Sequence, residues 1–201
     1  FLCFVCNCTR RFYMKKSWKK ALLAGLSIVM MGSFIAGCGS NNVMDIYSFG
    51  NQVIRSGQSE VTVALPYEMG KTSETTSVDG YPMDAYGSLS QHMLISVEAR
   101  QPAPNKALPT VAQFVDQKKS EYAKLGATVN VESIDLNGVQ AQLITGDFYV
   151  NKIKTSFSQY VFMDKGVLWN ITYRYPTDDQ IGADISKQIK DKIYVTQKKE
   201  G

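Results

Sequence analysis

The chain has 201 residues, 22 Lys plus Arg, 18 Asp plus Glu and one His, which gives a formal net charge of +4. Apolar residues make up 44%, which excludes a wholly disordered chain and fits one globular domain. All four Cys lie in the first 38 residues, so no disulfide scaffold can hold the rest of the chain. The positive charge would suit nucleic acid or a membrane surface if it belonged to the folded part.

A secretory signal is predicted near the start of the chain. The first Met is Met14, and four Lys follow it within six residues, ahead of an apolar run over 21–35. A basic segment, an apolar segment and small residues at the end are the parts of a signal peptide, which we place at 14–37. The apolar run is short for a membrane-spanning helix. Residues 1–13 are expected to be an over-extended gene start.

The segment 1–13 contains Cys3, Cys6 and Cys8, a spacing that could suggest a metal site. Such a site needs a fourth ligand and a fold to hold it, and neither is nearby. We therefore expect no metal there.

The residues Ile35, Ala36, Gly37 and Cys38 resemble a bacterial lipobox. The resemblance implies that a peptidase cuts between Gly37 and Cys38, and that Cys38 carries a diacylglyceryl group and an N-acyl chain such as palmitate. Several acyl chains anchor a protein stably where one would not. We expect a protein that is anchored by lipid to a membrane of the bacterial envelope and faces the extracytoplasmic side. The sequence does not specify whether this is an inner, an outer or a single membrane. The alternative is an uncleaved signal anchor with a free thiol at Cys38.

Removal of the signal changes the sign of the net charge. The discarded part holds six basic residues and no acidic one, which leaves 16 Lys plus Arg and 18 Asp plus Glu after the cut, a net charge of −2. The charge that suggested nucleic acid is therefore lost, and no nucleic-acid partner is expected.

The elements are predicted in chain order from residue 38. Residues 38–59 are rich in Gly, Ser, Asn and Gln and are expected to be a flexible tether, with a short helix over 44–54 as an alternative. A single globular domain is expected over 60–201. It opens with a strand over 61–66 that Pro66 closes, followed by a loop or irregular edge over 71–81.

A second strand is predicted over 94–99, and a Pro-bearing connection over 101–109 follows it. After this connection the apolar residues recur with the spacing of a helix, which predicts a helix of about 15 residues. Thr110 and Gln113 form its capping box, and Gly126 terminates it. The residues on its apolar face are Val111, Phe114, Val115, Tyr122 and Leu125.

A run of strands comes next. Strands over 128–136 and 139–149 flank Asn137 and Gly138, the favoured residues for a two-residue hairpin turn. A strand over 156–163 turns at 164–166 into a strand with a large apolar and aromatic face and a mostly polar face. The apolar face holds Val167, Trp169, Ile171, Tyr173 and Tyr175.

A closing helix is predicted after Pro176, with a capping box of Thr177 and Gln180. Its apolar stripe recurs every four residues at Ile181, Ile185, Ile189 and Ile193. The order of elements is that of an α+β fold.

The pattern resembles the PsbP-like α/β/α sandwich, which includes small lipoproteins of the DcrB-like kind. The resemblance rests on the strand ending in Leu65-Pro66, the helix 110–125 with Gly126, the segment 132–141, the aromatic strand that turns at Gly166, and the helix after Pro176. It implies a central antiparallel sheet of about five to seven strands flanked by two main helices. Members of this group act mostly as binding or assembly factors, and no functional residue can be transferred from them.

No catalytic residue, metal ligand or cofactor site is predicted. His92 has Ser88, Ser90 and Ser96 near it in sequence, but no nucleophile elbow is present. The carboxylates of Asp178, Asp179 and Asp184 lack the alternating spacing of a calcium loop. Asp178 and Asp179 suit a helix N-terminus. No phosphate-binding glycine motif occurs.

The aromatic residues of the C-terminal strands are interpreted first as sheet core. The second interpretation makes some of them an exposed patch for a partner or an apolar ligand. The residues considered for that patch are Tyr160, Trp169 and Tyr173.

The leading functional prediction is a noncatalytic, membrane-anchored envelope lipoprotein that binds a protein partner or assists assembly. The first alternative is a small-ligand or ion-binding lipoprotein associated with a transporter, which a closed and well-filled core would contradict. The second is an envelope hydrolase, which requires His92 within hydrogen-bond reach of a Ser or a carboxylate in a cleft. The partner and the oligomeric state stay open.

Overall fold

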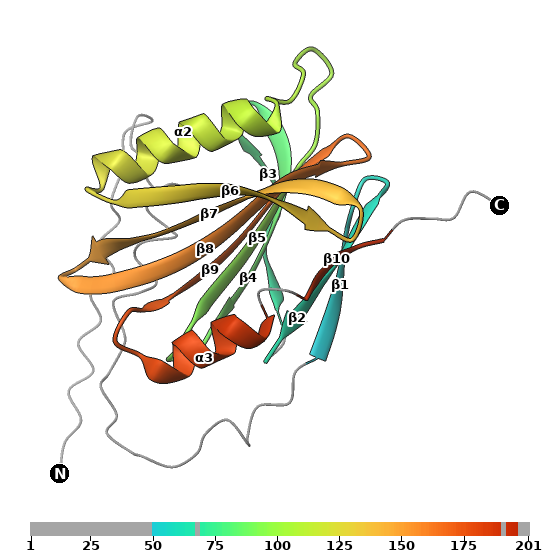
Figure 1. Ribbon diagram of the computed structural model, residues 1–201. Coiled ribbons are helices and arrows are strands. Elements are labelled where there is room, and N and C mark those ends of the chain that lie inside the picture. Colours follow the sequence, from blue (N-terminus) through green and yellow to red (C-terminus); the bar gives the residue numbers. More distant parts are fainter. Residues whose placement is uncertain (1–49, 67–68, 190–191, 197–201) are drawn as a thin grey trace, which may run out of the picture. The chain divides into compact units, whose positions relative to one another are not determined.

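The computed structural model describes residues 50–66, 69–189 and 192–196, and within 71–76 it describes the backbone only (Figure 1). The predicted gene-start segment, the signal peptide, the lipobox with Cys38 and the first part of the predicted tether lie outside these residues.

The described chain forms two sheets and two helices. The first sheet has three strands in the order β1-β2-β10, and the second has seven strands in the order β3-β4-β5-β9-β8-β7-β6. All neighbouring strands are antiparallel. The elements are β1 (Gly50–Ser56), β2 (Ser59–Leu65), β3 (Gly70–Val78), β4 (Tyr81–Leu89), β5 (Leu94–Arg100), α2 (Val111–Lys124), β6 (Thr128–Leu136), β7 (Val139–Val150), β8 (Ile153–Asp164), β9 (Val167–Pro176), α3 (Gln180–Ile189) and β10 (Ile193–Val195).

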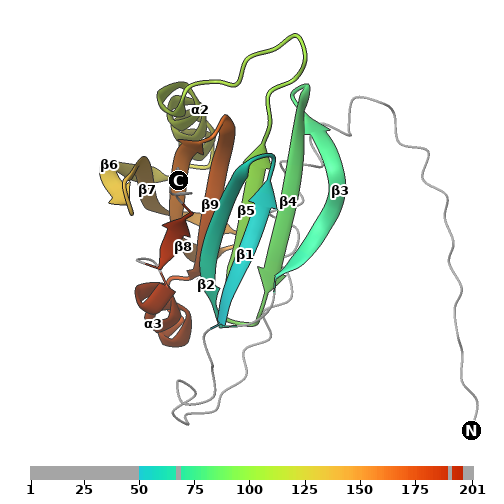
Figure 2. The same cartoon turned by 90° about the vertical axis from the view of Figure 1, so that its right-hand side faces the viewer.

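The two faces of the seven-stranded sheet are covered differently (Figure 2). On one face, the three-stranded sheet and α3 enclose the main core with side chains of β5, β8 and β9. On the other face, α2 packs across β6, β7 and β8, where Tyr122 stacks on Phe157 with ring centroids 4.2 Å apart. The predicted α+β class and the antiparallel sheet flanked by two helices are confirmed, whereas the three-stranded sheet was not predicted.

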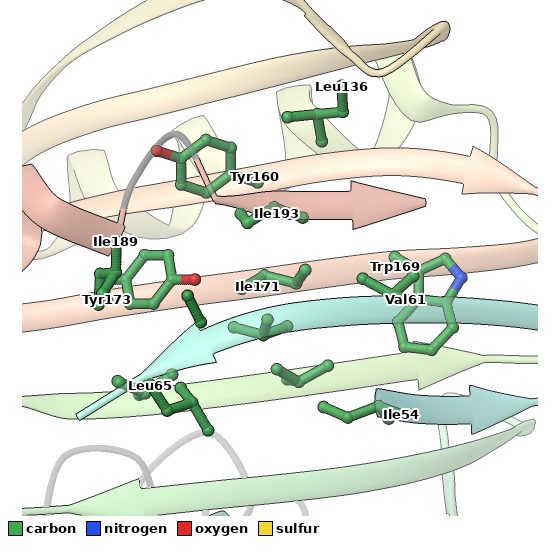
Figure 3. Close-up of a cluster of buried hydrophobic side chains, with 14 of the residues drawn as sticks. Ile54, Val61, Leu65, Leu136, Tyr160, Trp169, Ile171, Tyr173, Ile189 and Ile193 are labelled. Atoms are coloured by element: carbon green, nitrogen blue, oxygen red, sulfur yellow. The ribbon is translucent and has the colours of Figure 1, made fainter. Parts of the chain in front are cut away.

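Trp169 is a fully buried member of the main core (Figure 3). Its indole Nε1 donates to Ser59 Oγ at 2.9 Å, and Ser59 Oγ donates to Asp164 Oδ2 at 2.5 Å. Ser59 therefore satisfies two buried polar groups and connects β2 to the turn between β8 and β9.

The predicted tether is too long at its C-terminal end. Gly50–Ser56 forms β1, which pairs with β2 along its whole length around a turn at Gly57 (φ +55°). The globular part therefore includes residues 50–59, which were expected to belong to the tether, and the alternative helix over 44–54 is wrong from Gly50 onward. The strand is favoured because Ile54 is buried against the core, an effect that composition alone does not show.

The segment 71–81, predicted as a loop or an irregular edge, contains β3, an edge strand with two register shifts against β4. Strand β4 was missed because its sequence contains Pro82 and Gly87, which have low strand propensity. It forms because it is paired on both sides, with β3 and with β5.

The predicted helix near residue 111 is confirmed with its capping box. Gln113 N donates to Thr110 Oγ1 at 3.2 Å, and Thr110 N donates to Gln113 Oε1 at 2.9 Å. Gly126 follows the helix with φ +73°. The hairpin turn is also confirmed, since Asn137 and Gly138 have φ values of +55° and +90°.

The closing helix differs from its prediction at both ends. The side chain of Asp179, not Thr177, caps it, because Asp179 Oδ1 accepts from Gly182 N at 3.0 Å. The helix ends at Ile189, and Ile193 lies in β10, where it pairs with Val63 of β2. The four-residue spacing was misleading at Ile193 because a strand can bury the same side chain.

Candidate functional site

The aromatic residues considered for an exposed patch are part of the core. Trp169 and Tyr173 are 0% exposed and Tyr160 is 2% exposed (Figure 3). All three lie on the sheet face that α3 and the three-stranded sheet cover. The patch interpretation is therefore wrong for these residues, and the core interpretation is confirmed.

The single His lies next to a carboxylate. His92 Nδ1 and Asp179 Oδ2 are 2.8 Å apart, and both side chains are largely buried. Gln91 Nε2 lies 2.7 Å from His92 Nε2. The neutral imidazole with its proton on Nδ1 satisfies both contacts, because Nδ1–H donates to Asp179 and Nε2 accepts from Gln91.

Among the described residues, no Ser hydroxyl is hydrogen-bonded to this imidazole. Ser90 Oγ accepts from the backbone amides of His92 and Met93 at 3.2 and 3.1 Å and donates to the Met93 carbonyl at 3.4 Å. These bonds hold Ser90 in the turn before β5. The His92–Asp179 pair therefore orients an imidazole and joins that turn to the start of α3.

A polar layer lies under α2, on the sheet face opposite the main core. Gln159 Nε2 donates to Asn170 Oδ1 at 2.7 Å, and Asn170 Nδ2 donates to Glu98 Oε2 at 3.1 Å. Arg100 Nη2 donates to the same carboxylate oxygen at 3.4 Å. Sequence reasoning missed this layer, because its members come from β5, β8 and β9, and only strand pairing aligns them.

The charges of this layer act on one another. Burial alone would raise the pKa of Glu98, but the charges of Lys118 and Arg100, with hydrogen bonds from Asn170 and Arg100, hold that pKa below its usual value. The Arg100 guanidinium lies 4.9 Å from the centre of the Phe114 ring on α2, and Lys118 Nζ lies 5.3 Å from it. The contact between Arg100 and Phe114 therefore connects the polar layer to α2.

An open groove of about 540 Å³ runs beside α2. Its wall is the first part of α2 and its floor is made by β6 and β7, and Figure 1 shows α2 lying along these strands. Two glutamines of the floor are held by the edge strand, because Gln142 donates to Ser133 Oγ and Gln140 donates to Asp135 Oδ2. The lining residues are Val111, Ala112, Val115, Asp116, Lys119, Val131, Gln140, Ala141 and Gln142.

A second open hollow of about 420 Å³ lies at the turn between β7 and β8. Tyr149, which is 67% exposed, forms one side of it, and Lys152 and Asp178 are among its other lining residues. This hollow contains an exposed aromatic side chain, but charged residues surround it. The groove beside α2 is the more apolar of the two and is the better candidate for binding.

No group of three or more His, Cys, Asp or Glu side chains that could hold a metal occurs within the described ranges. None of the helices described there is long and apolar enough to cross a membrane.

Comparisons with known proteins give no family for this chain. No family model matches it, and a search of curated proteins finds no match. Among solved structures, a protein of unknown function from Pseudomonas aeruginosa, PA94, described as a putative regulator, is 12% identical, with a TM-score of 0.44 over 74% of this chain and 99% of its own. LpqN of Mycobacterium tuberculosis, described as involved in cell envelope biogenesis, is 13% identical, with a TM-score of 0.43 over 80% of this chain and 100% of its own. Likeness at this level says nothing about function.

Proposed function

We propose that this protein is a noncatalytic lipoprotein of the bacterial cell envelope that binds a protein partner on the extracytoplasmic side. The anchor is supported by the sequence over 14–38, in which a basic segment and an apolar run lead to Ile35-Ala36-Gly37-Cys38. Partner binding is supported by one structural observation, the open and largely apolar groove between α2 and the strands β6 and β7.

Labelling with a fatty acid tests the anchor. The wild-type chain should incorporate the label, and Cys38→Ala should abolish incorporation and leave an uncleaved precursor. Ser40→Ala serves as the control, since it lies two residues after the predicted cut, leaves Ile35-Ala36-Gly37-Cys38 intact and should leave labelling unchanged. Label that persists in Cys38→Ala would refute lipidation at this residue.

The openness of the groove favours a protein partner over a small ligand. Small-molecule sites enclose most of the ligand surface, whereas both hollows described above are open to solvent. Crosslinking in intact cells should recover the same envelope protein from repeated preparations. Recovery of no specific protein would count against partner binding, whatever the outcome of the labelling experiment.

A hydrolase is retained as a second candidate because His92 lies within hydrogen-bond reach of the Asp179 carboxylate. An imidazole oriented by a carboxylate is the base of several hydrolytic sites. Because the ring nitrogens of His92 contact Gln91 and Asp179 and no described Ser, a serine-reactive fluorophosphonate probe should leave the wild-type chain unlabelled. Labelling of the wild-type chain that His92→Ala prevents would show that the pair activates a nucleophile and would favour the hydrolase.

A further inference from the structure

The edge strand β6 has one side of its backbone unpaired within the described residues. It forms nine residue pairs with β7 without a register shift, and no backbone hydrogen bond between described residues reaches its outer side. A long and regular edge of this kind is a template for another strand. The opposite edge strand, β3, is interrupted by two register shifts, which are a common protection against such pairing.

The two faces of β6 differ in chemistry. Val131 points to the α2 side, where it lines the groove together with Val111 and Val115. Glu132 is exposed and, by alternation, points to the opposite face. A strand added beside β6 would therefore place every second side chain near the apolar groove and the others near Glu132.

We propose that β6 receives an extended segment of a partner protein as an additional strand, with apolar residues toward the groove and basic residues on the face of Glu132. This inference rests on the proposed function and deepens it by naming the mode of binding and the chemistry of the partner. Main-chain hydrogen bonds provide the affinity in strand addition, and alternate side chains provide the specificity.

The charges around the edge favour a basic segment. Glu132 is an exposed acid on its face of β6, whereas Asp135 lies on the groove face, where it accepts from Gln140 Nε2, and Asp116 of α2 lies 3.8 Å from Lys119. A second copy of this chain fits poorly, because antiparallel pairing about the middle of β6 sets Glu132 against the same residue of the copy. Like charges directly opposite each other in a sheet are destabilising.

The first test uses the full chain in detergent micelles and an octapeptide of alternating Lys and Val. Binding should protect backbone amides of β6 from hydrogen exchange, with no added protection in β3. A peptide with N-methylated amides and the same side chains should fail to bind, because it cannot donate main-chain hydrogen bonds. Equal binding of both peptides, or protection elsewhere only, would overturn the inference.

Charge reversal supplies the second test. Glu132→Lys should weaken binding of the Lys/Val peptide about fivefold and should favour a Glu/Val peptide instead. Val131→Lys places a charge in the groove and should weaken both peptides. Ser77→Lys is the matched control, since Ser77 is exposed on the opposite edge strand, and it should change neither affinity. Affinities that are indifferent to Glu132→Lys would contradict the proposed orientation.

A photo-crosslinking residue in intact cells separates this inference from the proposed function. Adducts formed at position 132 but not at position 77, and mapped to an extended basic segment of one protein, support both. Adducts of a single envelope protein at position 149 and none at position 132 keep the proposed function and reject strand addition at β6. Adducts at none of the three positions argue against both.

Discussion

The hydroxyl of Tyr173 lies in the main core, and within the described part of the chain it has no hydrogen-bond partner. Burial also raises the pKa of this hydroxyl. A buried polar group without a partner costs free energy, so its removal is inexpensive.

Tyr173→Phe should therefore leave the free energy of unfolding unchanged or raise it by about 1 kcal/mol. The control is Tyr81→Phe, which removes a hydroxyl that donates to the Ala107 carbonyl at 2.9 Å and should cost about 1 kcal/mol. Chemical denaturation of the full chain measures both. A larger loss for Tyr173→Phe than for Tyr81→Phe would show that the Tyr173 hydroxyl has a partner in solution.

Glu98 gives the protein an acid-sensitive component of stability. Its pKa in the folded chain lies below the ordinary value of 4.5. When folding lowers the pKa of a carboxyl group, that group stabilises the folded state in full at any pH above its unfolded pKa. This contribution to the free energy of unfolding is lost as the pH falls through the folded pKa. The free energy of unfolding should therefore fall as the pH decreases below about 4.5.

Glu98→Gln should flatten this part of the pH profile, because the titrating group is removed. Asn170→Ala removes a hydrogen bond to the Glu98 carboxylate, which brings the folded pKa of Glu98 closer to its unfolded value, so the loss of stability in acid should be smaller than in the wild type. Urea denaturation at a series of pH values measures both profiles. A Glu98→Gln profile as steep as that of the wild type would assign the acid sensitivity to other carboxyl groups.

At the scale of elements, the two helices differ in how far local sequence specifies their ends. The start of α2 follows from Thr110 and Gln113, which lie three residues apart and bond each other. The start of α3 does not follow from the same pattern at Thr177 and Gln180. Instead, Thr177 Oγ1 lies 2.9 Å from the hydroxyl Oγ of Ser156 in β8. Asp179 therefore caps the helix.

Asp179→Ala should lower the free energy of unfolding by about 1 to 2 kcal/mol, because it removes the cap of α3. It also removes the partner of the His92 imidazole. Thr177→Ala is the matched control and should cost less than Asp179→Ala. Thermal unfolding of the full chain distinguishes the two, and equal losses would restore Thr177 as the cap.

At the scale of the whole molecule, the two ends of the described chain meet in one sheet. Strand β2 lies between β1 and β10, so Val63 pairs with Gln52 on one side and with Ile193 on the other. Ile193 and Val195 are both buried in the main core. The short C-terminal strand therefore closes the sheet that covers Trp169.

A chain that ends at residue 191 should be less stable by roughly 3 to 6 kcal/mol, because it loses the burial of two aliphatic side chains. A chain that ends at Thr196 keeps β10 and should have the stability of the full chain. Denaturation with guanidinium measures both. Equal stability of the two truncated chains would show that β10 contributes little to the core.

The sequence alone was sufficient where the signal is local. The capping box of α2 and the turn at Asn137 and Gly138 each involve residues a few positions apart. Periodicity and capping depend on backbone geometry within one or two turns, so they can be predicted without a partner. The lipobox at 35–38 is also a local pattern, and it stays a prediction because it lies outside the described residues.

The tertiary structure decided everything that depends on which elements pair or cover one another. It placed 50–56 in a strand and Ile193 in another, buried Tyr160 and Tyr173, and aligned Glu98 with Asn170 across two strands. It also left β6 as a regular edge beside an open groove. The physical reason is the distance in sequence between the contacting residues, since Ser59 and Asp164 are 105 positions apart. No local pattern specifies which distant strand completes a sheet.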